Sequence, residues 1–224
     1  MSAIFITATG TDIGKTYLAT ALIRNWRDKG RAVDALKPVM TGFDPARPEA
    51  SDGGQLLAAL GRPVTSDEIA RISPWRYAAP LSPDFAAARE GRALDFDQLL
   101  NFSREALRKH PEELLIEGIG GVMAPLDARH TVLDWMTALK IPVLLVTGSY
   151  LGSISHTLTA FDALHRRELS VRAVVVNETP GSTVTVAETI GSVSRFAQPI
   201  PVLALSRSAG HDAGSQIERI AEFL

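Results

Sequence analysis

Two lysines near the start of the chain, Lys15 and Lys37, stand where they could act on the same polyphosphate. Lys15 belongs to residues 9–16, Thr-Gly-Thr-Asp-Ile-Gly-Lys-Thr, which link the apolar, β-branched run 3–7 to a helical pattern. Backbone N–H groups and the helix dipole favour an anion at such a junction. The glycine lets the backbone approach phosphates, the lysine can bridge β- and γ-phosphate oxygens, and the Thr16 hydroxyl can ligate Mg2+. This segment therefore predicts ATP or GTP binding.

The phosphate loop departs from the strict P-loop spacing at one position. That spacing requires glycine at position 9, where this chain has Thr9, and Gly10 comes one residue late. The alternative is a glycine-rich turn with a surface lysine, but Gly-Lys-Thr lies between an apolar strand and a helix, as the motif's mechanism requires. Asp12 in the same loop is either a contact to nucleotide or substrate, or a solvated loop acid.

Lys37 lies near the carboxyl end of the second predicted strand, residues 33–39, and Pro38 follows it. Ligands bind at that edge of an open α/β sheet, so this second cation is expected to face the phosphate loop. Two lysines around a transferring phosphoryl group would stabilise the charge that develops on it. The alternative for Lys37 is a strand-end lysine whose ammonium group reaches solvent. Thr41 is either a substrate contact or a turn residue.

Acidic residues follow at two further places. Glu117 ends the apolar strand 114–117 and precedes a glycine-rich loop, 118–121, which is thin enough for a ligand to approach. Its carboxylate could hold Mg2+ directly or through water, although an acid followed by glycines is also typical of an ordinary turn. Asp52, within Ala-Ser-Asp-Gly, is a second candidate Mg2+ ligand from a loop, and the same sequence is also common in turns.

Two more segments could bind parts of a ligand. Asn177, at the end of the predicted strand 171–177, has an amide able to pair with a base edge, or it forms a turn before Pro180. Residues 150–155 precede a helix whose first N–H groups could bind a carboxylate. Helix capping by the serines of that segment is the alternative.

The elements that must position these residues alternate between strand and helix along the chain. Continuous apolar strands imply burial on both faces, hence an α/β fold with a mostly parallel sheet flanked by helices on both faces. Two segments, 41–54 and 72–83, break the alternation and are candidate functional loops. The further strand-like runs are residues 141–147 and 201–205, and the last predicted helix covers about residues 215–224.

Composition limits the classes of partner. The 224 residues, 46% of them hydrophobic, can bury one core, so residues 1–224 are predicted to form a single domain. A net charge of -2 argues against nucleic acid and anionic membranes and favours small-molecule substrates. The chain has no cysteine, no secretion signal in residues 1–9 and no apolar run near the roughly 20 residues of a membrane span. We therefore expect a cytoplasmic protein.

Together these segments resemble the dethiobiotin synthetase family in order and spacing over nearly the whole chain. The resemblance rests on residues 9–16, Lys37-Pro38-Val39 with Thr41-Gly42, Asp52, Ala-Pro-Leu-Ser-Pro at 79–83, Glu117-Gly118 with Gly120-Gly121, and Asn177. The phosphate loop alone would not single out this family. The other segments, taken with it, do.

The resemblance implies a homodimeric, Mg2+-dependent enzyme of the P-loop NTPase type. It would convert 7,8-diaminononanoate, CO2 and ATP to dethiobiotin, ADP and phosphate, with Lys15 and Lys37 as its catalytic lysines. The implied metal ligands are Thr16, Asp52 and Glu117. The implied nucleotide and metal contacts together are Asp12, Ile13, Gly14, Lys15, Thr16, Tyr17, Asp52, Glu117, Gly118, Ile119, Gly120, Asn177 and Glu178. The implied substrate contacts are Thr41 and, from the partner subunit, Tyr150, Leu151, Gly152, Ser153 and Ser155.

A partitioning or cell-division switch ATPase shares the expected fold and is the rival from another class. Such proteins usually carry an additional lysine early in the phosphate loop, where this chain has Gly10, and often an amphipathic membrane tail, which is not evident here. The synthetase part of a cobyrinate amidating ligase is a second rival. This chain has no room for a glutamine amidotransferase domain and no cysteine to serve one.

Overall fold

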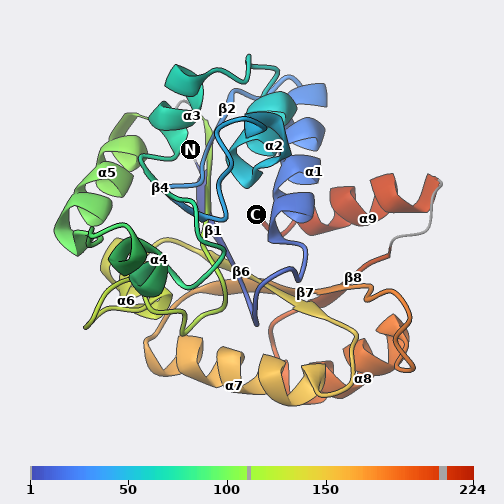
Figure 1. The fold of residues 1–224 in the computed structure, drawn as a ribbon. Helices are drawn as coiled ribbons and strands as arrows, with labels where there is room; N and C mark the ends of the chain where they lie inside the picture. The colour runs from blue at the N-terminus through green and yellow to red at the C-terminus, as the bar shows by residue number, and fades with distance from the viewer. Residues whose placement is uncertain (1, 110–111, 207–210) are drawn as a thin grey trace.

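Parallel strands form the centre of the molecule in this computed structural model, which describes residues 2–109, 112–206 and 211–224 (Figure 1). Within those ranges the main sheet has six strands in the order β2-β5-β1-β6-β7-β8, and neighbouring strands are parallel. Its strands are β1 (Ser2–Ala8), β2 (Val33–Leu36), β5 (Glu113–Glu117), β6 (Val143–Gly148), β7 (Val171–Asn177) and β8 (Val202–Leu205). The predicted α/β fold with a mostly parallel sheet is confirmed.

Helices cover both faces of this sheet, as the sequence predicts. One face carries α1 and α9, and the opposite face carries α5, α6, α7 and α8 (Figure 1). These helices are α1 (Lys15–Asp28), α5 (Phe96–Lys109), α6 (Val132–Leu139), α7 (Ser153–Arg166), α8 (Val186–Ala197) and α9 (His211–Ala221). The last helix, α9, thus begins before the start of the predicted range 215–224 and ends before its end. Among the described residues, no helix has the length and apolar character that crossing a bilayer requires.

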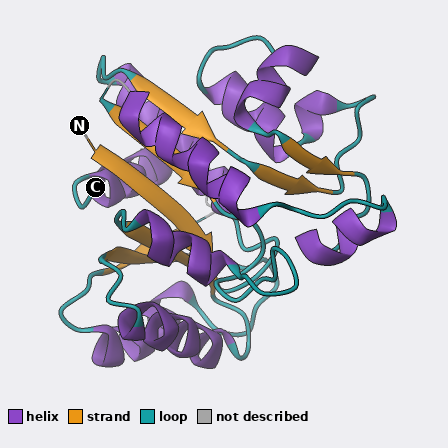
Figure 2. Ribbon diagram, turned by 90° about the vertical axis from the view of Figure 1, so that its left-hand side faces the viewer, coloured by secondary structure: helices purple, strands orange, loops and turns teal. Residues whose placement is uncertain are grey.

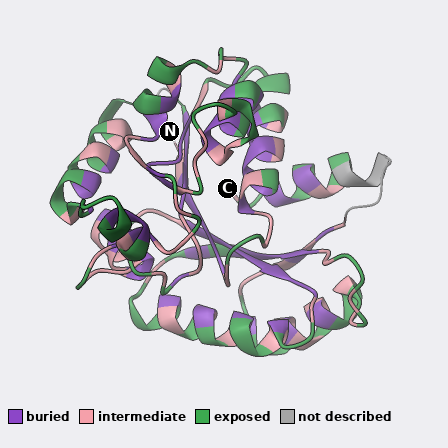
Figure 3. Cartoon of the chain, in the orientation of Figure 1, coloured by how far each residue is buried: buried purple, intermediate pink, exposed green. Residues whose placement is uncertain are grey.

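The central strands are buried on both faces because they are apolar at successive positions. Every residue of β5 and β6 is buried, and β1 and β7 are buried over most of their length (Figure 3). Phe5 of β1 meets Trp135 of α6 edge to face, with ring centroids 4.8 Å apart. The core therefore fixes β1, and with it the start of the phosphate loop.

A short second sheet interrupts the strand predicted over residues 33–39. Its two parallel strands are β3 (Val39–Thr41) and β4 (Trp75–Tyr77), which lie apart from the main sheet (Figure 2). Pro38 has no N–H to donate, and the N–H of Lys37 donates to the carbonyl of the last residue of α3 at 3.1 Å. The chain therefore leaves the main sheet at Lys37. The prediction of one continuous strand was wrong.

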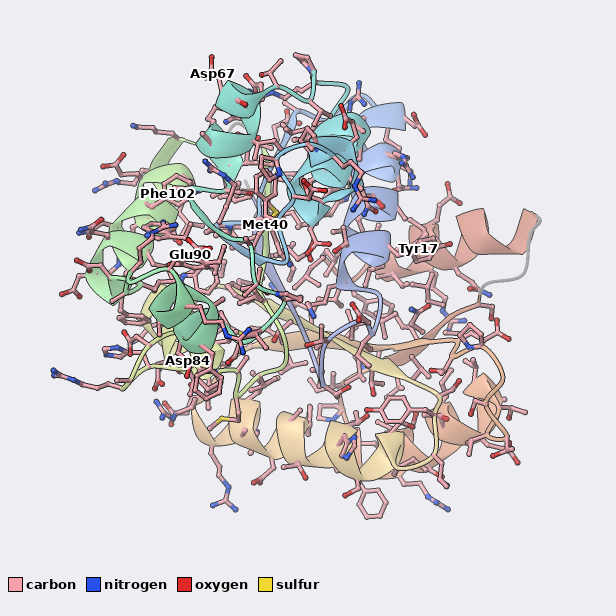
Figure 4. The ribbon with its side chains drawn as sticks, viewed as in Figure 1. Tyr17, Met40, Asp67, Asp84, Glu90 and Phe102 are labelled. Carbon is pink, nitrogen blue, oxygen red and sulfur yellow. The ribbon has the colours of Figure 1, made fainter. Side chains whose placement is uncertain are left out.

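Three short helices and one 3-10 turn surround this second sheet. They are η1 (Pro48–Ala50), α2 (Asp52–Ala59), α3 (Ser66–Ile72) and α4 (Pro83–Arg89). The segments 41–54 and 72–83, predicted as loops, thus contain β4 and the start of α2. Met40 of β3, labelled in Figure 4, contacts the start of α2 because its sulfur accepts a hydrogen bond from Gly53 N–H at 3.2 Å. This contact ties the first turn of α2 to β3.

Candidate active site

The phosphate loop joins β1 to α1 at the carboxyl edge of the sheet. Gly14 caps α1 in a left-handed conformation, with φ +104, and a side chain there would overlap the amide nitrogen of Asn177. The position therefore requires glycine. Lys15 is 6% exposed, and its ammonium group donates to Gly10 O at 3.0 Å and to Gly120 O at 2.8 Å. It thereby joins the phosphate loop to the loop that follows β5.

Lys37 is held by two carboxylates at the same edge. Its Nζ lies 2.6 Å from Glu117 Oε1 and 2.9 Å from Asp52 Oδ2, and it donates to Gly118 O at 2.8 Å. Lys37 is 2% exposed, so its ammonium group does not reach bulk solvent. Burial alone would lower its pKa, but the charges of Glu117 and Asp52 outweigh burial and raise the pKa of Lys37. The strand-end alternative for Lys37 is wrong.

Glu117 ends β5 and is 1% exposed. Its Oε1 accepts from the Thr16 hydroxyl at 2.7 Å, while its Oε2 is buried without a hydrogen-bond partner among the described residues. Burial raises the pKa of Glu117, and the charge of Asp52 adds to the effect, while Lys37 opposes both. A buried carboxylate oxygen without a partner is costly, so it marks a place where a cation or donor would be stabilised.

Asp52 begins α2, whereas the sequence placed it in a loop. The hydroxyl of Ser51 caps this helix by accepting from Gly54 N–H at 3.1 Å. Burial alone would raise the pKa of Asp52, but the neighbouring Lys37 lowers it below its usual range. Asp52 is therefore ionised at neutral pH and stands opposite Glu117 across Lys37.

The oxygen atoms of Thr16, Asp52 and Glu117 fit a hard cation such as Mg2+. Mg2+ takes oxygen ligands and is usually held by one or two carboxylates together with phosphates and water. The unpartnered Oε2 of Glu117 is an available oxygen of this kind. In the described part of the chain, no group of three His, Cys, Asp or Glu residues could hold a metal alone, as a softer or structural metal site would require.

Both lysines line one cavity of about 350 Å³. Burial and, less strongly, the positive charge of Lys37 lower the pKa of Lys15 to about 8. Tyr17, on the first turn of α1, stands at the rim with an exposed ring (Figure 4). The lining residues are Thr11, Asp12, Gly14, Lys15, Thr16, Tyr17, Lys37, Thr41, Asp52, Glu117, Ile119 and Gly120. The structure thus brings together most of the predicted nucleotide and metal contacts.

A second cavity, of about 520 Å³, adjoins the first and shares Thr11, Asp12 and Thr41 with it. Its other wall is the segment 80–83, which leads into α4. Asp84 on that helix lies across the molecule from Tyr17 (Figure 4). The sequence did not single out Thr11, although its place inside the phosphate loop was a signal. Asp12 lines both cavities, so its position agrees with a ligand contact.

Asn177, predicted to contact a base, ends β7 and supports the phosphate loop. Its amide nitrogen donates to Ile13 O at 2.8 Å, and its Oδ1 is buried without a hydrogen-bond partner in the described chain. That oxygen is an acceptor available to an amino group. Glu178 follows, with its N–H donating to Leu205 O at 2.8 Å. The first cavity does not include Asn177 or Glu178 in its lining.

Residues 150–155 lie at the start of α7, outside the lining of both cavities around the phosphate loop. Gly152 caps the helix in a left-handed conformation with φ +95 and supplies no side-chain cap. Ser153 is buried, and its hydroxyl has no hydrogen-bond partner among the residues described. Leu151 is 83% exposed. Neither cavity around the phosphate loop is lined by this segment, so one chain does not bring it to Lys15 and Lys37.

Comparison with known proteins decides the family. Residues 2–205 match a family described as an AAA domain. An ATP-dependent dethiobiotin synthetase of Methylobacterium nodulans is 48% identical over 218 residues, which cover 95% of this chain and 96% of the relative. The chain belongs to the ATP-dependent dethiobiotin synthetase family. The synthetase of Phenylobacterium zucineum is 49% identical over 215 residues, covering 95% of this chain and 92% of the relative.

The solved structures to which this member of the dethiobiotin synthetase family is similar share its fold but little of its sequence. The septum site-determining protein MinD of Pyrococcus horikoshii, complexed with Mg-ADP, has a TM-score of 0.61 at 13% identity, covering 99% of this chain and 94% of that protein. The cell division ATPase MinD of Pyrococcus furiosus has a TM-score of 0.58 at 15% identity, covering 100% and 98%. The expected resemblance to dethiobiotin synthetase is confirmed, and the likeness to switch ATPases extends only to the architecture.

Proposed function

We propose that this chain converts 7,8-diaminononanoate, CO2 and ATP to dethiobiotin, ADP and phosphate. The observation that carries the proposal is the convergence of Lys15 and Lys37 on one cavity, beside Thr16, Asp52 and Glu117. A family identity of 48% over nearly the full length supports the same reaction. The adjoining second cavity offers room for the diamine next to the phosphate-binding loop.

The reaction needs no protein nucleophile. One substrate amine adds to CO2, loses a proton and forms a carbamate. A carbamate oxygen then attacks the γ-phosphorus of ATP, and ADP leaves. The second amine attacks the carbonyl carbon of the resulting carbamic-phosphoric anhydride, phosphate leaves and the ureido ring closes. Because both amines belong to one bound molecule, ring closure is intramolecular and gains from a fixed geometry.

The chain's own residues stabilise charge on the polyphosphate. Lys15 reaches the cavity from the first turn of α1, where the backbone N–H groups and the helix dipole also favour an anion. Lys37 is held from the opposite side by Asp52 and Glu117, so its charge is already in position before phosphoryl transfer. The start of α1 and the segment between β2 and β3 thus contribute one cation each.

Mg2+ held by Thr16, Asp52 and Glu117 would supply further charge neutralisation on the phosphate oxygens. The buried and unpartnered Oε2 of Glu117 supports this ligand set. We further propose that Asn177 and Glu178 contact the adenine base. The unpartnered Oδ1 of Asn177, next to the phosphate loop, supports an acceptor role toward the adenine amino group.

We also propose a homodimer in which residues 150–155 of one subunit bind the substrate carboxylate at the site of the other. Their absence from the lining of the chain's own two cavities supports this arrangement, and so does the uncapped start of α7. Two apolar side chains near this helix, Leu151 at 83% and Met123 at 60% exposure, support a contact surface there.

Thr41, which lines both cavities, is proposed to contact the diamine. We place this enzyme, as one domain over residues 1–224, in the cytoplasm, where ATP is available.

A three-substrate assay tests the reaction. Purified protein with Mg2+ should release phosphate from ATP only when 7,8-diaminononanoate and CO2 are both present, and dethiobiotin should appear in equal amount by mass spectrometry. Omission of either co-substrate is the control. Turnover without the diamine, stimulated by a protein or a lipid, would contradict the proposal and favour a switch ATPase.

A further inference from the structure

A chain of threonine hydroxyls, two of them fully buried, connects the phosphate loop to the start of α7. Thr9 Oγ1 lies 3.3 Å from Thr147 Oγ1, and Thr147 Oγ1 lies 2.7 Å from Thr157 Oγ1. Thr157 in turn donates to Ser153 O at 2.6 Å. Thr147, in β6, and Thr157, in the second turn of α7, are fully buried. Neither residue lines a cavity of the proposed active site.

The direction of these hydrogen bonds follows from counting protons. A threonine hydroxyl has one proton to donate and can also accept. Since the proton of Thr157 goes to Ser153 O, Thr147 must donate to Thr157, and Thr9 must then donate to Thr147. All three bonds therefore run from the phosphate loop toward α7. Thr9 occupies the position where the strict P-loop spacing has glycine, and its side chain turns toward β6 to begin this chain.

The far end of the chain is a helix start that no side chain caps. α6 and α8 begin with complete capping boxes, which use Thr131 with Asp134 and Thr185 with Glu188. The N-cap residue of α7 is Gly152 and that of α1 is Gly14, so neither helix start has a side-chain cap. The hydrogen bond from Thr157 holds this turn from the buried side. Ser153 N–H donates to Tyr150 O at 2.9 Å, so the N–H groups of Ile154 and Ser155 are the ones that remain for a ligand in the described structure.

We propose that Thr147 and Thr157 are positioning residues for the substrate carboxylate. Through Ser153 O they set the place of the first turn of α7 relative to the sheet and the phosphate loop of the same subunit. This inference rests on the proposed function, in which that turn binds the carboxylate at the partner's site. Loss of a hydroxyl should weaken binding of the carboxylate end and leave binding of ATP unchanged, because the phosphate loop keeps its own backbone contacts.

Steady-state kinetics of Thr147→Val and Thr157→Val test this inference. Valine keeps the side-chain shape and removes the hydroxyl. We expect the KM for 7,8-diaminononanoate to rise about fivefold, as one lost hydrogen bond implies, with the KM for ATP and kcat changed by less than about twofold. The preference for 7,8-diaminononanoate over 7,8-diaminononane, which lacks the carboxylate, should fall by the same factor. Thr147→Ser, which restores the hydroxyl, should behave as the wild type.

Thr189→Val is the matched control, because Thr189 is also a buried helical threonine that donates to a carbonyl four residues earlier, Thr185 O at 3.0 Å. It lies in α8, and we expect wild-type kinetics. Thermal melting compares the fold of all variants, and Thr157→Val serves if Thr147→Val does not fold. Folded valine variants with an unchanged preference for the carboxylate would overturn the inference. Wild-type protein without diaminononanoate-dependent phosphate release would overturn the proposed function, and this inference with it.

Discussion

Lys37 is placed where a substitution would affect both the stability of the fold and the proposed chemistry of the site. Its ammonium group lies between Glu117 and Asp52, so one buried positive charge is shared by two carboxylates. A buried ion pair adds little net stability, but removing one partner leaves an uncompensated charge. The same arrangement fixes a cation at the cavity wall. Substitution should therefore affect stability and activity by separate physical routes.

Lys37→Met should lower the rate of dethiobiotin formation by at least about 100-fold, because a fixed cation at the phosphoryl group is lost. It should also lower the free energy of unfolding by roughly 3 kcal/mol, because Glu117 is left buried and unpaired. Urea denaturation and the three-substrate assay measure the two effects. The double variant Lys37→Met with Glu117→Gln should recover much of the stability and none of the activity. Full activity in Lys37→Met would remove the catalytic assignment.

The places of residues in the fold could be predicted from sequence where the motif is contiguous. Lys15 and Thr16 were placed correctly because residues 9–16 carry their own strand-to-helix junction. The hydrogen bond from Asn177 to Ile13 O joins residues far apart in the chain, and no local pattern encodes it. The assigned roles of the candidate residues are still predictions; the structure adds that most of them line one cavity.

At the level of elements, helix starts divide into those closed by side chains and those left open. α6 is of the first kind, since Thr131 and Asp134 form a capping box and Arg167 lies 3.3 Å from the same carboxylate. Burial alone would raise the pKa of Asp134, but the hydrogen bonds from Thr131 and the charge of Arg167 lower it. The carboxylate is therefore the form that stabilises α6, and with it the packing of Trp135 on Phe5.

Asp134→Asn should lower the free energy of unfolding by about 1 kcal/mol at pH 7, where the wild-type carboxylate is ionised in both states. Because the pKa is depressed in the folded protein, this contribution is present above the unfolded pKa and is lost as pH falls through the folded pKa. The difference between the two proteins should thus begin to shrink as the pH falls below about 4, the unfolded pKa of aspartate, and should vanish only below the lower folded pKa. Denaturation curves across this range measure it. Asp162→Asn, which breaks an exposed pair with Arg166, should change stability little.

The strands of the main sheet were predictable because short, continuous apolar runs bounded by turns are typical of buried strands. β3 and β4 were missed because three-residue strands show no periodicity, and their pairing joins residues 39–41 to residues 75–77. Asp52 was placed in a loop because Ser-Asp-Gly is common in turns, whereas Ser51 here caps α2. Tertiary contacts decide both cases.

At the level of the whole molecule, the proposed active site needs two chains. The lysines of one subunit and the α7 start of the other would form each site, so residues 150–155 could not be placed from one chain alone. A dimer of two such subunits has two equivalent sites. This arrangement predicts that subunits with different defects can complement each other.

Lys37→Met and Ser153→Asp should each be inactive with 7,8-diaminononanoate, the second because a carboxylate at the α7 start repels that of the substrate. After the two are mixed and allowed to exchange subunits, heterodimers contain one intact site, and about a quarter of wild-type activity should appear. Each variant alone, taken through the same exchange, is the control. A mixture as inactive as its components would argue against a shared site. Sedimentation velocity reports the dimer independently.

The place of β1 in the sheet bears on how the protein is made. β1 leaves the ribosome before the other strands of the main sheet, yet it lies between β5 and β6, with Ser2 opposite Glu113 and Phe5 opposite Val143. Its apolar residues therefore have no strand partner until β5, which begins at Glu113, has been synthesised. Pairing over such long sequence separations is slow, and unpaired strands aggregate. The nascent amino-terminal segment should thus be a binding site for ribosome-associated chaperones.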